Sequence, residues 1–79
     1  MQDQTLLNVL GDEISDRFTA KTRVDEDSVK FNSDQVTYDE LEVLESLATN
    51  VLYPEYTHTI VVKRSGTGVC IIVKADKLA

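Results

Sequence analysis

The chain has 79 residues, 28% of them charged, with a formal net charge of −6 and a single cysteine. This length suits one domain over residues 1–79 with a thin core, and one cysteine excludes an internal disulfide. The acidity argues against direct binding to nucleic acid, and no apolar run approaches the roughly 18 residues of a membrane span. The first residues lack the features of a signal peptide, so we expect a cytoplasmic protein of a bacterium or a virus-infected cell, without membrane contact.

The charge is unevenly distributed along the chain. Residues 1–52 hold twelve acids and four bases, a balance of −8, whereas residues 53–79 hold two acids and four bases, a balance of +2. A net charge away from zero keeps small domains dispersed. A more specific interpretation is that the acidic part of the chain forms a surface that binds a basic partner.

The first predicted element is an amphipathic helix that fades by Ala20, with Asp3 or Thr5 as its N-cap. Apolar residues recur at spacings of three and four, as they do along the buried face of a helix: Leu6, Leu7, Leu10, Ile14 and Phe18. Gly11 interrupts the pattern and costs a helix about 1 kcal/mol relative to alanine. Either the helix is locally weak there, or another element packs closely against it.

A minor hairpin is predicted next, in which residues 22–24 pair loosely with residues 29–31. In the second of these segments Lys30 separates two apolar residues, as in a strand with one buried face. The acidic run Asp25–Asp27 carries side chains that favour turns. A loop leading into one short strand is the alternative.

The clearest local signal is a capping box, in which Thr37 and Glu40 each bond the backbone N–H of the other. It predicts a helix to about Asn50, before Tyr53-Pro54, because the residue preceding a proline avoids helical geometry. The inner face of this helix is apolar: Leu41, Leu44, Leu47, Ala48 and Val51. Its outer face is acidic, with no lysine or arginine in the helix to balance it: Asp39, Glu40, Glu42 and Glu45.

The strongest strand signal is a hairpin of two β-branched segments, Thr57–Arg64 and Val69–Ala75, separated by Ser65–Gly68 with its two glycines, Gly66 and Gly68. A two-residue turn of type II′ at Gly66-Thr67 and a four-residue loop over Ser65–Gly68 imply the same register, in which the numbers of paired residues sum to 133. One face is predicted to be core, with His58 and Arg64 at its ends: Ile60, Val62, Val69, Ile71 and Val73. On the other face Val61 lies opposite Ile72 among Thr59, Lys63, Cys70 and Lys74. That is more apolar surface than a freely solvated face usually has.

These elements predict an α+β domain with the order α-β(β)-α-β-β. Two amphipathic helices are expected to pack on a small antiparallel sheet that is dominated by the C-terminal β-hairpin. No internal repeat or linker divides the chain.

No combination of residues predicts catalysis. His58 and Cys70 fall on opposite faces of the predicted hairpin, which leaves neither a nucleophile–base pair nor a shared zinc site. In an EF-hand loop counted from Asp25, Lys30 and Val36 would replace the required glycine and glutamate. The two glycines of the predicted turn join strands rather than opening a helix, which indicates a turn and not a phosphate loop. We therefore expect no enzyme, no cofactor and no metal site.

The favoured hypothesis is a small protein-interaction module, an adaptor or inhibitor, that binds a basic partner surface. Small acidic proteins of phage or mobile-element origin have this kind of composition. The predicted partner-binding residues come from the acidic helix and the mixed hairpin face: Asp39, Glu40, Glu42, Glu45, Val61, Lys63 and Ile72. An alternative is an assembly component that forms a homodimer or larger homo-oligomer through the C-terminal hairpin. A third hypothesis is a small-ligand or metal-binding domain, with its site under the hairpin or at residues 25–27.

Overall fold

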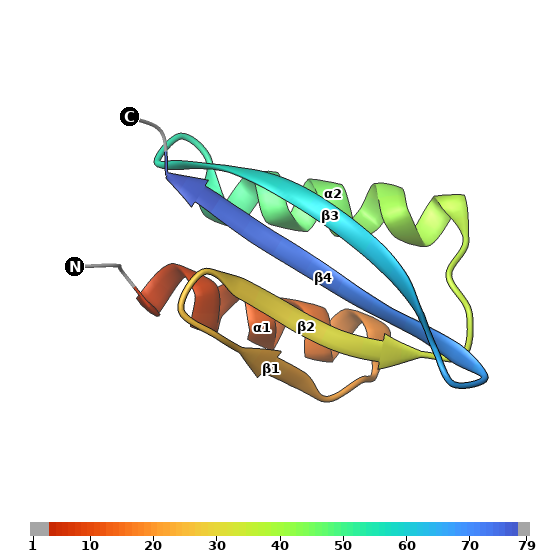
Figure 1. The fold of residues 1–79 in the computed structure, drawn as a ribbon. Coiled ribbons are helices and arrows are strands. Elements are labelled where there is room, and N and C mark those ends of the chain that lie inside the picture. Colours follow the sequence, from red (N-terminus) through yellow and green to blue (C-terminus); the bar gives the residue numbers. More distant parts are fainter. Residues whose placement is uncertain (1–3, 78–79) are drawn as a thin grey trace.

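The computed structural model describes residues 4–77 as a four-stranded antiparallel sheet with two helices on one face (Figure 1). The elements, in chain order, are α1 (Gln4–Phe18), β1 (Thr22–Val24), β2 (Ser28–Ser33), α2 (Tyr38–Leu52), β3 (Tyr56–Ser65) and β4 (Gly68–Lys77). The predicted α+β class and element order are confirmed, and the strand that the predicted order gives in parentheses is present as β1. Within this range, neither helix is long and apolar enough to cross a membrane.

The sheet order is β1-β2-β4-β3, so the last strand of the chain lies in the interior of the sheet. The two hairpins, β1–β2 and β3–β4, are joined side by side through antiparallel pairing of β2 with β4. Val73 of β4, for example, lies between Val29 of β2 and Ile60 of β3. The chain crosses from one hairpin to the other through α2.

Both predicted hairpins form. β1 pairs with β2 in the predicted segments, with Arg23 opposite Lys30, so the alternative of a loop and one strand is wrong. β3 pairs with β4 in the predicted register along all ten residues of each strand. At the turn, Gly66 has a φ of 61° whereas Thr67 has no positive φ. This is the φ pattern of a type II′ turn, which matches the twist of the flanking strands.

The second helix begins at the predicted capping box. The Glu40 N–H donates to Thr37 Oγ1 at 3.2 Å, and the Thr37 N–H donates to Glu40 Oε1 at 2.9 Å. α2 continues beyond the predicted end to Leu52, whose side chain is buried. In α1, Thr5 lies within the helix and is not its cap, while the alternative cap Asp3 lies outside the described residues.

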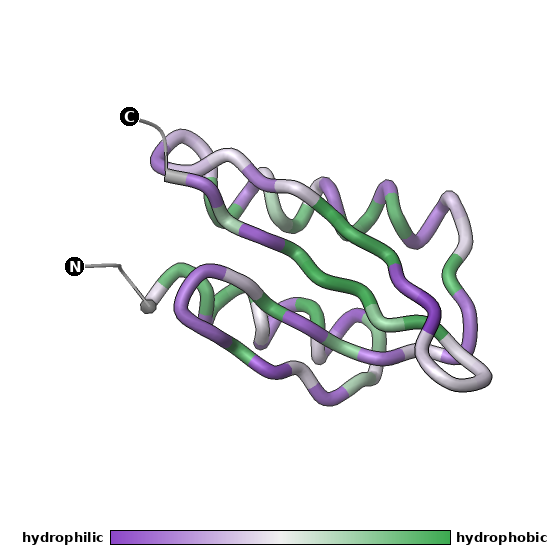
Figure 2. The backbone as a smooth tube through the Cα atoms, in the orientation of Figure 1, coloured by the Kyte–Doolittle hydropathy of each residue, from purple (hydrophilic) through white to green (hydrophobic). Residues whose placement is uncertain are grey.

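The core lies between the two helices and one face of the sheet. Its most deeply buried side chains come from both helices and the two interior strands: Leu10, Ile14, Val29, Leu44, Leu52, Ile71 and Val73. Figure 2 shows the apolar stretches of β3 and β4 running side by side. The expectation that Val62 belongs to the core is wrong, because its side chain is 41% exposed. Val62 lies on β3, which has a neighbouring strand on one side only in the described sheet.

Gly11 is explained by close packing and not by local weakness of the helix. A Cβ at this position would lie 3.0 Å from Cγ2 of Val24 and 3.3 Å from Oγ1 of Thr22. The Thr22 hydroxyl also donates a hydrogen bond of 3.2 Å to the Gly11 carbonyl. The short strand β1 therefore rests directly on α1 at this glycine.

The interpretation of both hairpin glycines as turn residues is correct only for Gly66. Gly68 begins β4 without a positive φ. A Cβ at Gly68 would overlap the carbonyl oxygen of Ser33. Gly68 therefore permits a close approach between the start of β4 and the end of β2.

We predict that Gly68→Ala lowers the free energy of unfolding by about 1–3 kcal/mol, because β2 has to move away from β4 to admit the methyl group. Thr67→Ala is the matched control, since Thr67 lies in the same turn, is exposed and has no positive φ; it should cost less than about 0.5 kcal/mol. Urea denaturation followed by circular dichroism measures both values. Equal losses in the two variants would contradict the close approach as the cause.

Candidate functional site

The solvent-facing side of the two helices is strongly acidic. α1 and α2 pack against each other over one face of the sheet (Figure 1), and Arg17 is the one base that their sequences contain. Seven carboxylates accompany it: Asp12, Glu13, Asp16, Asp39, Glu40, Glu42 and Glu45. We call these seven residues the acidic helix layer.

Most of the acidic helix layer has no cationic partner. The Glu40 carboxylate accepts from the Thr37 N–H in the capping box. Glu45 Oε1 lies 4.0 Å from Nε2 of His58, which makes an ion pair only when the imidazole is protonated. Within residues 4–77, none of the seven carboxylates lies within salt-bridge distance of a lysine or arginine. Glu42 and Glu45, which are three residues apart on α2, repel each other.

The opposite face of the sheet is not covered by either helix. Strand alternation and register place thirteen side chains on it: Arg23, Ser28, Lys30, Asn32, Thr57, Thr59, Val61, Lys63, Ser65, Cys70, Ile72, Lys74 and Asp76. We call these residues the open sheet face. One row of paired residues crosses all four strands, from Arg23 through Lys30 and Ile72 to Val61. In this row the apolar pair has cations on its β2 side, and Lys63 and Lys74 lie two residues from it along β3 and β4.

The open sheet face has a net positive charge, with four cations against one carboxylate, that of Asp76, which accepts a hydrogen bond of 3.4 Å from the Thr59 hydroxyl. Lys30 Nζ lies 3.1 Å from Asp25 Oδ2, and this is the ion pair that the structure shows for its cations. In the part of the chain that the structure describes, Arg23, Lys63 and Lys74 have no carboxylate within salt-bridge distance. Arg23 lies directly opposite Lys30, and two like charges in this arrangement destabilise a sheet. Asp25 compensates the charge of Lys30 but makes no ion pair with Arg23 among the described residues.

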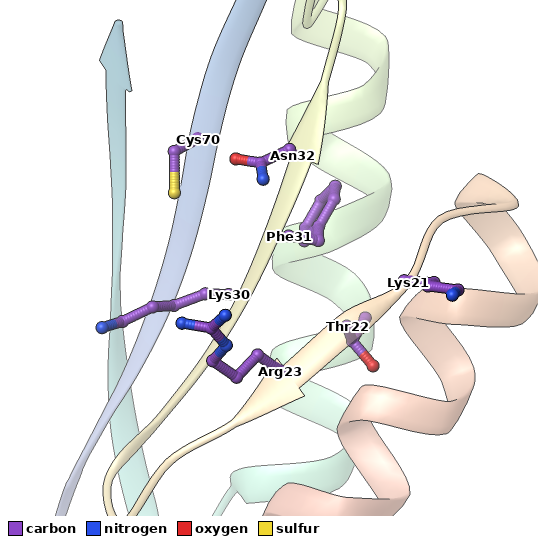
Figure 3. Close-up of a pocket in the computed structure, with 7 residues that line it drawn as sticks. All are labelled: Lys21, Thr22, Arg23, Lys30, Phe31, Asn32 and Cys70. Carbon is purple, nitrogen blue, oxygen red and sulfur yellow. The ribbon is translucent and has the colours of Figure 1, made fainter. Parts of the chain in front are cut away.

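An open pocket of about 390 Å³ lies beside this pair of cations (Figure 3). It is lined by Lys21, Thr22, Arg23, Lys30, Phe31, Asn32 and Cys70. In Figure 3, Arg23 and Lys30 extend in the same direction from neighbouring strands. These groups can attract an anion, but the Cys70 thiol has no imidazole beside it, because His58 lies on the helix side of the sheet. The pocket therefore lacks a nucleophile–base pair.

A second hollow, of about 290 Å³, lies between α2 and the outer strand β3. We call it the edge groove; its lining residues are Leu41, Glu45, His58, Ile60 and Val62. Three of these five side chains are apolar, and Val62 is among the most exposed large apolar residues of the described chain. An apolar groove next to a free strand edge is suited to protein contacts.

The structure divides the predicted partner-binding residues between two surfaces. The four acids of α2 belong to the acidic helix layer, whereas Val61, Lys63 and Ile72 belong to the open sheet face. Val61 lies opposite Ile72 and Lys63 opposite Cys70, as the predicted register requires. The sheet and the core separate the two groups, so these residues do not form one site.

Sequence reasoning missed two contributions to these surfaces. Arg23 and Lys30 reach the open sheet face because β2 pairs with β4, which places Lys30 opposite Ile72. The three acids of α1 join those of α2 because the two helices pack together. Lys30 already occupied the polar side of the predicted minor hairpin, but no local signal specified the strand with which that hairpin would pair.

Among the described residues, no group of three His, Cys, Asp or Glu side chains is arranged to hold a metal ion. A scan against protein-family models, a search of curated proteins and a search of solved structures each found no match to this chain.

We predict that the Cys70 thiol reacts with a maleimide in the native protein, because the open sheet face leaves it partly accessible. The control is Val73→Cys in a Cys70→Ala background, since position 73 lies on the same strand but is fully buried. That thiol should react only through unfolding, and hence at a rate that rises with denaturant. If native Cys70 reacts as slowly as the cysteine at position 73, this face of the sheet is covered.

Proposed function

We propose that the protein is a protein-binding module, an adaptor or inhibitor, that docks its acidic helix layer on a basic surface of a partner protein. One observation supports this most strongly: the fold gathers seven carboxylates and one base in the helices and leaves unpaired cations on the opposite face of the sheet. The proposed setting is the cytoplasm, where a lone thiol stays reduced.

A surface of this kind acts through the sum of many weak contacts. Exposed ion pairs contribute about 0.2–1 kcal/mol each, so a partner has to meet several of the carboxylates at once. The combined field of the acidic helix layer accelerates encounter with a cationic surface, chiefly at low ionic strength. The same field repels phosphate backbones, which favours a protein over a nucleic acid as the partner.

The centre of the proposed contact is the solvent side of α2. A shallow hollow there is lined by two carboxylates and three neutral polar residues: Glu42, Glu45, Ser46, Thr49 and Asn50. A lysine or arginine of the partner seated between the carboxylates would relieve their repulsion and donate hydrogen bonds to oxygen atoms of the neutral side chains. Both carboxylates are exposed, so such a cation can reach them without any rearrangement of the helix.

We predict that Glu42→Gln/Glu45→Gln weakens binding of a nona-arginine peptide by about 2- to 10-fold, because two of the available carboxylates are lost. A titration followed by amide NMR shifts measures the affinity and shows where the peptide binds. The largest shifts should lie on α1 and α2, and the affinity should fall as salt rises.

The matched control is Asp34→Asn/Glu55→Gln, which removes the same charge from exposed residues outside the helices. It should bind the peptide almost as well as the native protein. If this control loses as much affinity, or if the shifts are spread evenly over the molecule, the effect comes from net charge alone and the proposed docking surface is wrong.

A further inference from the structure

We propose that β3 is a dimerisation edge: it pairs antiparallel with β3 of a second copy about a two-fold axis through Val61, joining two sheets into one. This inference is separate from the proposed partner binding, although the Glu45 carboxylate belongs to both surfaces. It commits to a second copy of this chain as the occupant of the free edge and of the edge groove beside it.

The first argument is the backbone of β3. The strand has ten residues and pairs with β4 without interruption, so no bulge twists its outer edge away. Ser65 and Gly68 close the two-residue turn and form a hydrogen-bonded pair, so the odd-numbered residues of β3 direct their backbone groups toward β4. The even-numbered residues direct theirs outward, where the described sheet provides no partner.

The second argument is the contrast between the two edges of the sheet. The other edge, β1, is three residues long and carries Arg23, and a short charged edge discourages pairing. β3 is long, contains no proline, and has Ile60, Val61 and Val62 at its centre. Its charged residues, Lys63 and Arg64, are confined to the end near the turn. Of the two edges, only β3 lacks the usual protection against pairing.

The third argument is the register that a two-fold axis allows. Symmetry requires paired residues to lie on the same face, so an axis at Val61 places Ile60 opposite Val62 of the second copy. It also places Arg64 opposite His58 of the second copy, and the Glu45 carboxylate lies 4.0 Å from that imidazole. An arginine at this position supplies the cation that Glu45 lacks.

In the two neighbouring registers, apolar side chains lie opposite charged or polar ones. An axis at Ile60 would place Val62 against His58 of the second copy, and an axis at Val62 would place Arg64 against Ile60. Only the axis at Val61 both matches the apolar residues of the edge groove and brings opposite charges together. The exposed part of Val62, 41% of its surface, is then covered by β3 of the second copy.

The oligomeric state is measured by light scattering between about 5 and 500 µM, a range that detects association of modest affinity. We expect the mass to rise from 8.9 kDa toward twice that value. A mass that remains at 8.9 kDa overturns the proposal. Growth beyond the dimer also overturns it, because a two-fold interface closes on itself.

The pairing edge is tested with Val62→Pro, which removes an outward N–H and leaves the bonds between β3 and β4 in place. The dissociation constant of the dimer should rise at least about 10-fold while the circular dichroism spectrum stays native. Val62→Ile keeps the N–H and the apolar side chain, and should dimerise like the native protein. Equal dimerisation of the two variants would show that β3 does not pair through its backbone.

The register is tested by disulfide formation in a Cys70→Ala background. Val61→Cys should cross-link on mild oxidation, because residues that face themselves across a non-hydrogen-bonded pair have Cα atoms about 4.5 Å apart. Thr59→Cys should remain a monomer on a non-reducing gel, since residue 59 then faces Lys63 of the second copy. Cross-linking at position 59, or none at position 61, contradicts the proposed axis.

Discussion

The pairing of β4 with both β2 and β3 is the constraint on which the rest of the structure depends. It joins two hairpins that are far apart in the sequence, and it places Ile71 and Val73 beneath the helices as part of the core. Both helices pack on the face that these residues define, because a chain of this size has enough apolar residues for one hydrophobic core only. The other face of the sheet is consequently left open.

That single-sided arrangement also separates the charges of the molecule. The acids of α1 and α2 face solvent on one side, while Arg23, Lys30, Lys63 and Lys74 occupy the other. Clustering of like charges weakens the folded state. The proposed docking on a basic partner would offset this repulsion, and β3 is the third surface, for which we propose a second copy as partner. A dimer would bring two acidic helix layers into one assembly and strengthen binding to a repetitive partner.

The local features of the fold were predictable because each has a local cause. The capping box specifies where α2 begins, and the turn at Gly66-Thr67 specifies the register of the long hairpin. The pairing of β2 with β4 has no such signal, since it depends on which apolar faces bury best together. The acids of α2 and the Val61–Ile72 pair were therefore predicted as candidate site residues, but Arg23 and Lys30 were not. The exposure of Val62 was missed for the same reason, because it depends on β3 lying at an edge.

The separation of charge between the two faces is tested most directly by NMR relaxation with cationic and anionic forms of one nitroxide probe. A charged probe accumulates near a surface of opposite sign and relaxes the amides there. The cationic form should act most strongly on the amides of α1 and α2, and the anionic form on those around Arg23, Lys30 and Lys63. Identical relaxation profiles for the two forms would contradict a molecule with one acidic and one basic face.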